Sequence, residues 1–416
     1  MTPTPLERIV RDQFRASDPD LDLRVGVEIE FLCFDRETRR PAPPIEAAGP
    51  DGSVPGTVSV VAELAARRGW LRAEGPGLPR FVRSDGTVVS WEPGGQIEIA
   101  TPPMPSLDDV DAMITGTVGE VTVALEEHGI GLLARGLDPW TPVDVPQLWL
   151  DHPRYRRMSA HYDRGGPEGR RMMRQSAAAH VNLDFGRDPI ARWNRANLLL
   201  PAAIAIFANS PTVEGRPGWR SERARAWRTL DPSRTGAFPP APDPPAEYLE
   251  FARRASAFLL GEEGGPAVPW RETGCDDEAA WRSHLSTLFP EVRPRTYLEV
   301  RCVDSLPPHH VTLAAAFLAG AVYGSAEPPT DLPPTKERLR TAGRDGLGDP
   351  AMREEAMGWW AVARAGLVEL GADFASATIL EKLDDFVSTF TRTGRDPGSA
   401  PEEWVIPQRS ATSALP

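Results

Sequence analysis

Polar residues spaced two apart recur in four short segments of the chain, and each segment alternates them with apolar residues. In a β-strand, alternate side chains share a face, so each segment would turn its polar residues to one side and its apolar residues to the core. The polar residues are carboxylates, amides, one imidazole and one guanidinium, whereas a merely solvated face usually carries Lys, Thr and Ser. We therefore predict an antiparallel sheet with one face built for chemistry. Its polar residues are Glu28 and Glu30, Gln96 and Glu98, His180, Asn182 and Asp184, and Glu299 and Arg301.

Carboxylates gathered on one face repel each other unless cations lie between them. Glutamate oxygens suit hard cations, and Mg²⁺ takes a few carboxylates while it keeps positions for phosphate oxygens and water. A solvated edge strand would explain Glu28 and Glu30 if they stood alone, but the matching strands favour a site for two or three metal ions. The predicted metal ligands are Glu28, Glu30, Glu98 and Glu299.

Arginines are available to complete a site for phosphate. Magnesium ions on the phosphates of ATP, with arginines nearby, are the usual apparatus of phosphoryl transfer. The guanidinium group binds phosphate or carboxylate bidentately. Arg301 shares a strand face with Glu299, and Arg223, Arg225 and Arg234 lie close together in the segment 221–236. The alternative for Arg223 and Arg225 is a place on a helix surface, paired with nearby glutamates.

Five segments in order then resemble the glutamate–cysteine ligases, most closely the plant and proteobacterial type and its actinobacterial relatives of the ergothioneine pathway. The resemblance runs from about Gly26 to Asp304. It rests on Gly26-Val-Glu-Ile-Glu, Pro93-Gly-Gly-Gln-Ile-Glu, Val181-Asn-Leu-Asp-Phe, Ala208-Asn-Ser-Pro with the following Arg-x-Arg-x-Trp and Arg-Thr-Gly strings, and Phe289-Pro-Glu-Val-Arg-Pro-Arg-Thr-Tyr-Leu-Glu-Val-Arg.

The resemblance implies an α+β fold of the glutamine-synthetase type, with a curved, mainly antiparallel sheet, a polar concave face and helices on the outer face. It implies that ATP phosphorylates the γ-carboxylate of glutamate and that an amine then displaces phosphate, giving a γ-glutamyl amide. The cofactors would be ATP and Mg²⁺, with Mn²⁺ as a substitute. The assigned residues are Arg301, Arg225 and Arg234 for catalysis, and Gln96, Asn182, Arg223 and His180 for binding of substrate or nucleotide.

Departures from the family pattern leave the amine open. His180 stands where the family strand usually has Gln, and it could bind metal, phosphate or substrate. The segment 172–179 lacks the Cys or Thr often seen there, and the stretch after Trp227 lacks an acidic residue. The expected substrates are glutamate, ATP and cysteine, or another amine if the protein is a sister ligase. A non-catalytic relative would have lost metal glutamates, and a metal-dependent hydrolase would not need the arginine strings.

Composition excludes several other classes of protein. The formal net charge of −13 disfavours nucleic acid and anionic membrane surfaces as partners. Three cysteines without a CxxC motif indicate neither a disulfide framework nor a zinc site. The amino terminus does not resemble a signal peptide, and the longest apolar run is too short for a membrane span. We expect a cytoplasmic protein, whose oligomeric state the sequence leaves open.

Because the motifs are dispersed yet must converge, we expect one catalytic domain over residues 1–392. Its motif core would span 23–304, a helical part would span 309–392, and 393–416 would be a flexible tail. The Pro-rich segment 234–245 is expected to be a loop able to cover the site. Helices are predicted at 58–68, 106–129, 198–209, 311–323 and 352–370, a strand at 131–134, and a hairpin over 80–96 around an Asp-Gly turn.

Overall fold

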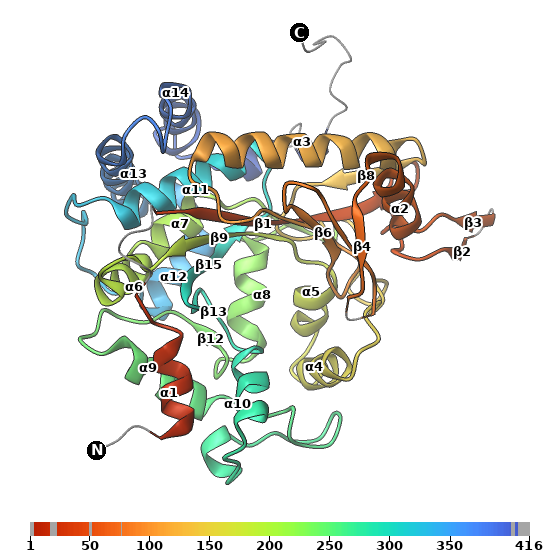
Figure 1. Ribbon diagram of the computed structural model, residues 1–416, viewed down its shortest axis with the longest axis horizontal. Coiled ribbons are helices and arrows are strands. Elements are labelled where there is room, and N and C mark those ends of the chain that lie inside the picture. The colour runs from red at the N-terminus through yellow and green to blue at the C-terminus, as the bar shows by residue number, and fades with distance from the viewer. Residues whose placement is uncertain (1–3, 17–22, 50–51, 76, 401–403, 407–416) are drawn as a thin grey trace.

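A nine-stranded sheet, antiparallel in all its pairings, forms the centre of the molecule (Figure 1). The structure is a computed structural model that describes residues 4–16, 23–49, 52–75, 77–400 and 404–406. The strand order is β14-β15-β9-β1-β7-β6-β5-β4, and β8 pairs with the second half of β1. The strands are β1 Val25–Asp35, β4 Leu71–Ala73, β5 Arg80–Val82, β6 Val88–Trp91, β7 Ile97–Ala100, β8 Ile130–Leu133, β9 Ala178–Asp184, β14 Val292–Pro294 and β15 Tyr297–Asp304.

The register of the sheet brings the four motif segments side by side. Glu30 lies opposite Glu98, Glu28 opposite His180, and Glu299 opposite Asn182. The alternate residues of the same strands form the core, where Val27, Ile29, Ile99, Val181 and Val300 are all fully buried. Strand periodicity therefore places the chemistry on one face and the hydrophobic core on the other, as predicted.

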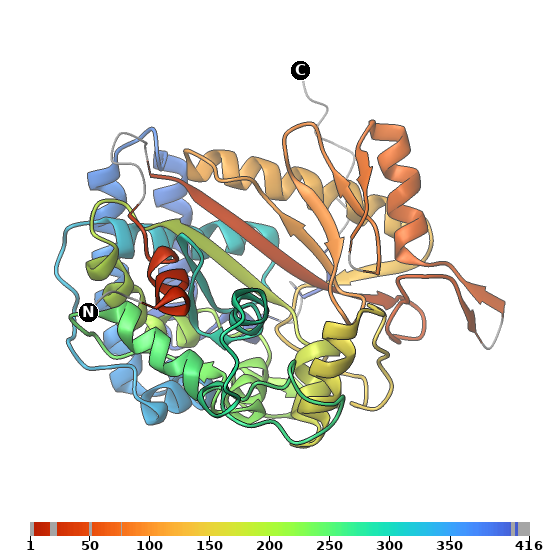
Figure 2. The ribbon, with the colours of Figure 1, turned by 60° about the horizontal axis from the view of Figure 1, so that its bottom comes forward.

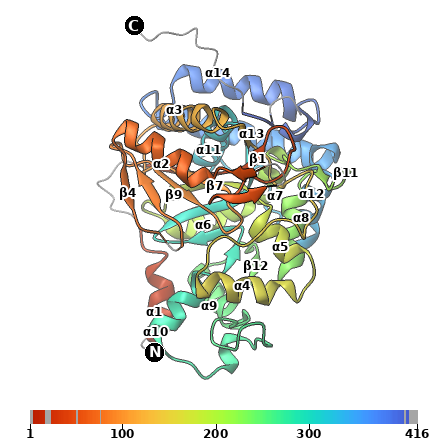
Figure 3. The same ribbon diagram turned by 90° about the vertical axis from the view of Figure 1, so that its right-hand side faces the viewer.

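Helices cover both faces of the sheet. Three long helices, α3, α11 and α13, pack behind the apolar face, and α11 is buried almost all round because it lies between α3, α13 and β9 (Figure 1). The shorter helices α4, α5 and α8 lie on the polar side, opposite α3 (Figures 2 and 3). The α-helices are α1 Pro5–Asp12, α2 Thr57–Arg68, α3 Leu107–Glu126, α4 Pro153–Asp163, α5 Glu168–Arg174, α6 Pro189–Leu198, α7 Leu200–Ile206, α8 Glu222–Leu230, α9 Pro244–Arg254, α10 Glu278–Leu285, α11 Pro308–Tyr323, α12 Lys336–Arg344, α13 Pro350–Leu370 and α14 Ala377–Phe386.

Long periodic segments were predicted well. The helices expected near 58–68, 106–129, 311–323 and 352–370 correspond to α2, α3, α11 and α13, and the predicted strand at 131–134 is β8. The helix expected at 198–209 corresponds to α7, Leu200–Ile206, which is shorter than predicted and is separated at Leu199 from the preceding helix α6. Pro201 lacks the amide hydrogen that a continuous helix would need there.

The segment 234–245 is an irregular loop over residues 237–243, as predicted, but tertiary contacts hold it in place. Its first residues form β12 (Thr235–Gly236), which pairs with β13 (Phe289–Pro290), and α9 begins at Pro244. Between them the buried Phe238 donates its N–H to Asn197 Oδ1 at 2.9 Å. Proline-rich composition indicated a loop, but the sequence could not show that tertiary contacts would hold it.

Part of the segment expected to be a flexible tail packs against the rest of the molecule. Asp396 is buried, and the segment 404–406 pairs with β8 through Val405 and Leu133. Ala134 donates its N–H to the carbonyl of Trp404 at 2.8 Å, and Ile406 donates to Leu132 at 3.0 Å. The other tail residues, 401–403 and 407–416, lie outside the described residues.

The described helices also bear on the membrane question. Within the described ranges, no helix combines the length and the apolar character that crossing a bilayer requires.

Candidate active site

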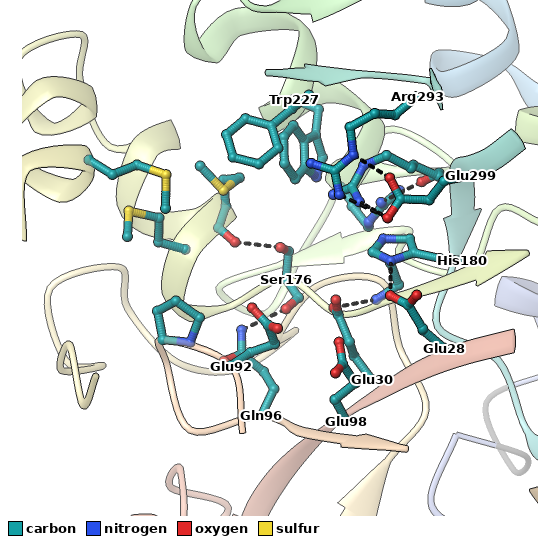
Figure 4. Close-up of a pocket in the computed structure, with 18 of the residues that line it drawn as sticks. Glu28, Glu30, Glu92, Gln96, Glu98, Ser176, His180, Trp227, Arg293 and Glu299 are labelled. Atoms are coloured by element: carbon teal, nitrogen blue, oxygen red, sulfur yellow. Dashed lines mark hydrogen bonds and ion pairs between the residues drawn. The ribbon is translucent and has the colours of Figure 1, made fainter. Parts of the chain in front are cut away.

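A cavity lies between the polar face of the sheet and the helices α4, α5 and α8 (Figure 4). Its volume is about 200 Å³. The polar wall comes from β1, β7, β9, β15 and the β6–β7 hairpin. The acidic and imidazole groups on this wall are Glu28, Glu30, Glu92, Glu98, His180 and Glu299.

One half of the polar face is an acidic cluster, which we define as Glu30, Glu92 and Glu98. Their carboxylate oxygens lie within 4.8 Å of one another. Glu30 accepts the N–H of Ala178 at 2.8 Å, and Glu98 accepts the hydroxyl of Ser90 at 2.9 Å. Burial, with the neighbouring negative charge added, raises the pKa of Glu30 to about 8 and that of Glu92 to about 7, and raises the pKa of Glu98 well above its usual range.

These raised pKa values indicate that too little positive charge lies near the acidic cluster to keep its carboxyl groups ionised. Arg223 and Arg301 lower the pKa of Glu30, but they do not compensate for its burial beside Glu98. A divalent cation would displace the bound protons and neutralise the cluster. Oxygen donors of this kind fit Mg²⁺ or Mn²⁺.

Glu92 was missed in the sequence, although a signal for it exists. Its N–H donates to the carbonyl of Gln96 at 2.9 Å, which closes the β6–β7 hairpin. Trp91 is buried in the core and Ser90 reaches Glu98, so alternation turns Glu92 to the same side as Ser90. The prediction did not extend to Glu92, which directly follows the strand β6.

The other half of the polar face is an ion-paired cluster, which we define as Glu28, His180 and Glu299. Their potential ligand atoms also lie within 4.8 Å of one another. Asn182 donates to Glu28 Oε1 at 2.9 Å, and His180 Nδ1 lies 3.5 Å from Glu28 Oε2. Burial, with the charge of Arg301 added, lowers the pKa of His180 to about 4. The neutral ring therefore keeps a lone pair for a metal ion or a substrate proton.

Glu299 already has cations of the chain beside it. Arg293 forms a bidentate pair with its carboxylate, with Nη2 2.8 Å from Oε1, and Arg301 Nη1 lies 3.3 Å from the same oxygen. Burial alone would raise the pKa of Glu299, but the charges of Arg293 and Arg301 hold it well below its usual range. Arg293 was not singled out in the sequence, because its approach depends on the pairing of β14 with β15.

Two of the four predicted arginines line the cavity. Arg301 points into it between the rings of Trp227 and Phe289, at 5.9 and 5.8 Å from their centroids. Arg223 lies on α8 and donates from Nη2 to the carbonyl of Arg301 at 2.7 Å. Both guanidinium groups are therefore fixed and face the two carboxylate clusters.

Arg225 lies outside the cavity lining, contrary to the prediction. It pairs with Glu222 and, at 3.1 Å, with Glu168. On a helix, residues four apart share a face whereas residues two apart do not. Arg223 and Trp227 therefore face the cavity together, and Arg225 points away from it.

Arg234 is also misplaced by the prediction. It is fully buried, and its guanidinium donates to the carbonyl of Thr287 at 2.7 Å from Nη2 and to the carbonyl of Ser256. The ring of Phe258 lies 4.5 Å away. The pairing of β12 with β13 turns this side chain into the protein, so its contacts are structural.

The predicted amide residues have different positions. Gln96 lines the cavity and donates to the carbonyl of Ser176 at 2.7 Å, and its buried Oε1 has no hydrogen-bond partner among the described residues. Asn182 is not part of the lining but holds Glu28 in place. Asn182 therefore acts on the cavity only through Glu28.

An apolar wall faces the carboxylates across the cavity (Figure 4). Its side chains come from α4, α5 and α8 and from the strand β13, and three are thioethers. None was predicted as a site residue, although Trp227 and Phe289 stand in two of the family strings and Met172 and Met173 stand in the segment 172–179. The wall consists of Met158, Met172, Met173, Trp227 and Phe289.

A second pocket of about 380 Å³ adjoins the cavity and shares Ser286, Arg293 and Arg295 with it. Tyr248 and Tyr297 also line this second pocket. It therefore combines aromatic rings with guanidinium groups beside the ion-paired cluster.

Comparison with known proteins agrees with this arrangement. The family model described as glutamate–cysteine ligase family 2 matches residues 24–406. The glutamate–cysteine ligase of Arabidopsis thaliana, named chloroplastic, is 31% identical over 412 residues, covering 88% of this chain and 74% of that protein. The Brassica juncea enzyme is 30% identical over 328 residues, covering 72% of this chain and 60% of its own length.

A solved structure shares the fold. The glutamate–cysteine ligase of Francisella tularensis, in complex with AMP, superposes with a TM-score of 0.52 at 12% identity, over 92% of this chain and 84% of that one. At this identity the likeness shows the fold alone, and it confirms the predicted glutamine-synthetase-like α+β architecture. By the match of the family model over most of its length, the chain belongs to glutamate–cysteine ligase family 2.

Proposed function

We propose that the protein is an ATP-dependent glutamate–cysteine ligase that works through γ-glutamyl phosphate. The observation that carries this proposal is a single cavity in which a cation-deficient acidic cluster faces Arg223 and Arg301. Family membership supports the same activity, and residues 24–406 would act as one catalytic domain. The Francisella tularensis relative was solved with AMP, which agrees with nucleotide use.

The reaction needs two displacements. An oxygen of the glutamate γ-carboxylate attacks the γ-phosphorus of ATP, and the bond from that phosphorus to ADP breaks. The amine nitrogen of the acceptor then attacks the γ-carbonyl carbon, the carbon–oxygen bond to phosphate breaks, and the amine loses a proton. Such transfers require positioning and charge neutralisation more than covalent help from the protein.

The proposed metal ligands are Glu30, Glu92 and Glu98 in one half of the polar face and Glu28, His180 and Glu299 in the other. Magnesium ions bound there would neutralise the phosphate oxygens of ATP. Arg301 and Arg223 would bind the transferred phosphoryl group or a substrate carboxylate, because their guanidinium groups are held at the cavity. Gln96 has an unpartnered acceptor available for the substrate ammonium group.

The two ends of the site differ in chemistry, and this supports an orientation for the substrates. The second pocket, with Tyr297 and Arg295, suits the base and phosphates of a nucleotide. The apolar wall around Met172 and Trp227 suits the uncharged side chain of the acceptor amine. Glutamate would then lie between them, beside the carboxylate clusters.

Cysteine is the proposed acceptor, and a thioether wall is compatible with a soft thiol. The sequence departures at 172–180 fall on this wall and on His180, so a sister ligase with another amine is the second candidate. For the compartment we propose the cytoplasm. We propose no nucleic-acid partner.

The first experiment is ADP release from Mg-ATP and glutamate with a panel of amines, cysteine first. A rate that depends on glutamate and is highest with cysteine supports the proposal. Release that is highest with a different amine identifies a sister ligase. Release of AMP and pyrophosphate contradicts the acyl-phosphate route.

A second experiment follows the oxygen atoms. Glutamate labelled with ¹⁸O in its γ-carboxylate should transfer label to inorganic phosphate, because the bridging oxygen leaves with phosphate. Product formation without label in phosphate would contradict the proposed intermediate.

A further inference from the structure

Asp304, the last residue of β15, is a buried carboxylate outside the cavity lining. Only 1% of Asp304 is exposed. Four groups of the chain surround its two carboxylate oxygens. Oδ2 accepts the N–H of Asn209 at 2.8 Å and the hydroxyl of Ser210 at 2.7 Å. Oδ1 accepts the hydroxyl of Ser221 at 2.9 Å and lies 3.8 Å from Arg223 Nη1.

Two of these partners also hold the first turn of α8. The hydroxyl of Ser221 caps α8 by accepting the N–H of Ala224 at 3.0 Å, while its hydrogen goes to Asp304. The hydroxyl of Ser210 accepts the N–H of Arg223 at 3.2 Å in the same manner. A hydroxyl has one donor and two acceptor positions, so both can serve the helix and the carboxylate together.

Gly136 packs closely against the Asp304 carboxylate and leaves no room for a larger side chain. A Cβ on Gly136 would fall 2.3 Å from the carboxyl carbon of Asp304. The carboxylate is therefore fixed by close packing as well as by hydrogen bonds, and it connects β15 to the start of α8.

The inner face of α8 carries the side chains that reach the cavity. Arg223 and Trp227 lie one turn apart and both line it, and Arg223 Nη2 also donates to the carbonyl of Arg301. The Nε of Arg223 and the Nε1 of Trp227 are buried and have no hydrogen-bond partner among the described residues. These groups are the ones whose aim depends on where α8 begins.

We propose that Asp304 is a positioning residue that fixes the first turn of α8 and thereby aims Arg223 at the substrate. The proposal rests on the proposed ligase function for its kinetic readout. Asp304 itself touches no reacting atom, so its effect passes through Arg223. Loss of the Asp304 charge should lower kcat/KM while the protein still folds.

The test is Asp304→Asn, which keeps the shape but places an amide donor against groups that are themselves donors. We expect kcat/KM for glutamate or ATP to fall at least tenfold in the folded variant. The matched control is Asp138→Asn, because Asp138 is also buried and accepts two backbone N–H groups, from Trp140 and Thr141, without touching α8. The control should keep kcat and KM within twofold.

A double-mutant cycle separates positioning from general damage. If Asp304 acts through Arg223, Asp304→Asn should have little further effect in an Arg223→Ala background. Additive losses, or kinetics of Asp304→Asn within twofold of the parent, would overturn the proposal. If Asp304→Asn does not fold, Ser221→Ala is measured in its place and should shift the same kinetic constant in the same direction.

Direct binding keeps this test independent of the proposed function. Calorimetric titration with Mg-ADP and with glutamate measures the affinity for each ligand, to which Arg223 should contribute, and it requires no turnover. If the parent protein releases no ADP with any amine, the ligase function fails. A tenfold weaker affinity in Asp304→Asn alone would then still support the positioning role, and unchanged affinity for both ligands would refute it.

Discussion

The two halves of the polar face hold similar carboxylates in opposite electrostatic states. In the acidic cluster, the pKa of Glu30 is raised to about 8 because burial and Glu98 oppose its charge. In the ion-paired cluster, the pKa of Glu299 is held well below its usual range by Arg293 and Arg301. The carboxylates of both clusters are buried or half-buried on the same face of the sheet, so the difference comes from the arginines and not from burial.

This contrast indicates where charge must come from outside the chain. In the ion-paired cluster, Arg293 and Arg301 already supply positive charge beside Glu299. The acidic cluster lacks such partners, and a divalent cation is the natural counter-charge. The proposed need for a metal ion is therefore greatest in the acidic cluster and smaller in the ion-paired cluster, where arginine supplies part of the charge.

The largest expected effect is on the acidic cluster. Glu30→Gln keeps the shape but removes a charge from the proposed metal site. We expect kcat/KM to fall by about 100-fold or more, since loss of even an outer partner of a metal ligand costs about 10–100-fold. ADP release measures the rate, and Mn²⁺ binding followed by electron paramagnetic resonance should weaken in parallel.

The control for Glu30→Gln is Glu337→Gln, at an exposed position on α12. It should leave both the rate and Mn²⁺ binding unchanged. Near-normal turnover of Glu30→Gln would remove the acidic cluster from the mechanism.

Activity should depend on the shape of the cationic side chain at position 301 as well as on its charge. Arg301→Lys keeps the charge but loses the bidentate fork, so we expect kcat to fall more than tenfold while the fold is retained. Circular dichroism checks the fold, and Arg340→Lys at an exposed site of α12 is the control. Unchanged kcat would mean that charge alone is sufficient in this half.

The stability of the metal-free protein should depend on pH because of the acidic cluster. Glu30 and Glu92 have folded-state pKa values near 8 and 7, above the value of 4.5 for an ordinary glutamate. A raised pKa means that the folded state binds protons more tightly than the unfolded state. The resulting contribution to the free energy of unfolding is fully present below about pH 4.5 and is lost as pH rises through 7 and 8. The free energy of unfolding should therefore fall by up to about 1.4 kcal/mol per pH unit for each carboxyl.

Thermal unfolding in a chelator between pH 5.5 and 8.5 measures this slope, and Mg²⁺ should restore stability most at the high end of the range. Glu30→Gln should flatten the difference between the two conditions. A slope identical to that of the parent would show that Glu30 is ionised without metal.

The smallest catalytic effect is expected outside the cavity. Arg234→Ala removes hydrogen bonds to the carbonyls of Thr287 and Ser256 and should cost about 3 kcal/mol of stability. The kcat of the folded enzyme, measured well below its melting temperature, should change less than about threefold. A tenfold loss of kcat with normal stability would indicate that Arg234 takes part in catalysis.

Much of the site was predictable because a strand leaves few choices. Once Glu28, Glu98 and Glu299 are placed on strands, the period of two decides their face, and apolar neighbours decide which face is buried. The face of Glu92 follows from the same rule when the alternation is extended one residue beyond β6. The assignment of Arg225 failed because Arg223 lies on a helix, where a residue two positions later points elsewhere.

The remaining features depend on contacts between distant segments. Arg293 reaches Glu299 because β14 turns back on β15, and Arg234 is buried because β12 pairs with β13. The apolar wall forms because α5 packs against α8 and α4 packs against α5, and no local sequence pattern predicts these contacts.

The sequence by itself determined the motif strands, their two faces and the carboxylates on the polar face, since each depends on residue type and short-range periodicity, and the resemblance of its ordered segments indicated the family. Only the tertiary structure decided which carboxylates are neutralised by arginine and which lack a cation. It also decided which arginines face the cavity, and that Asp304 holds the start of α8. The physical reason is that charge compensation and burial are set by distances between segments far apart in the chain, which alternation along one strand cannot specify.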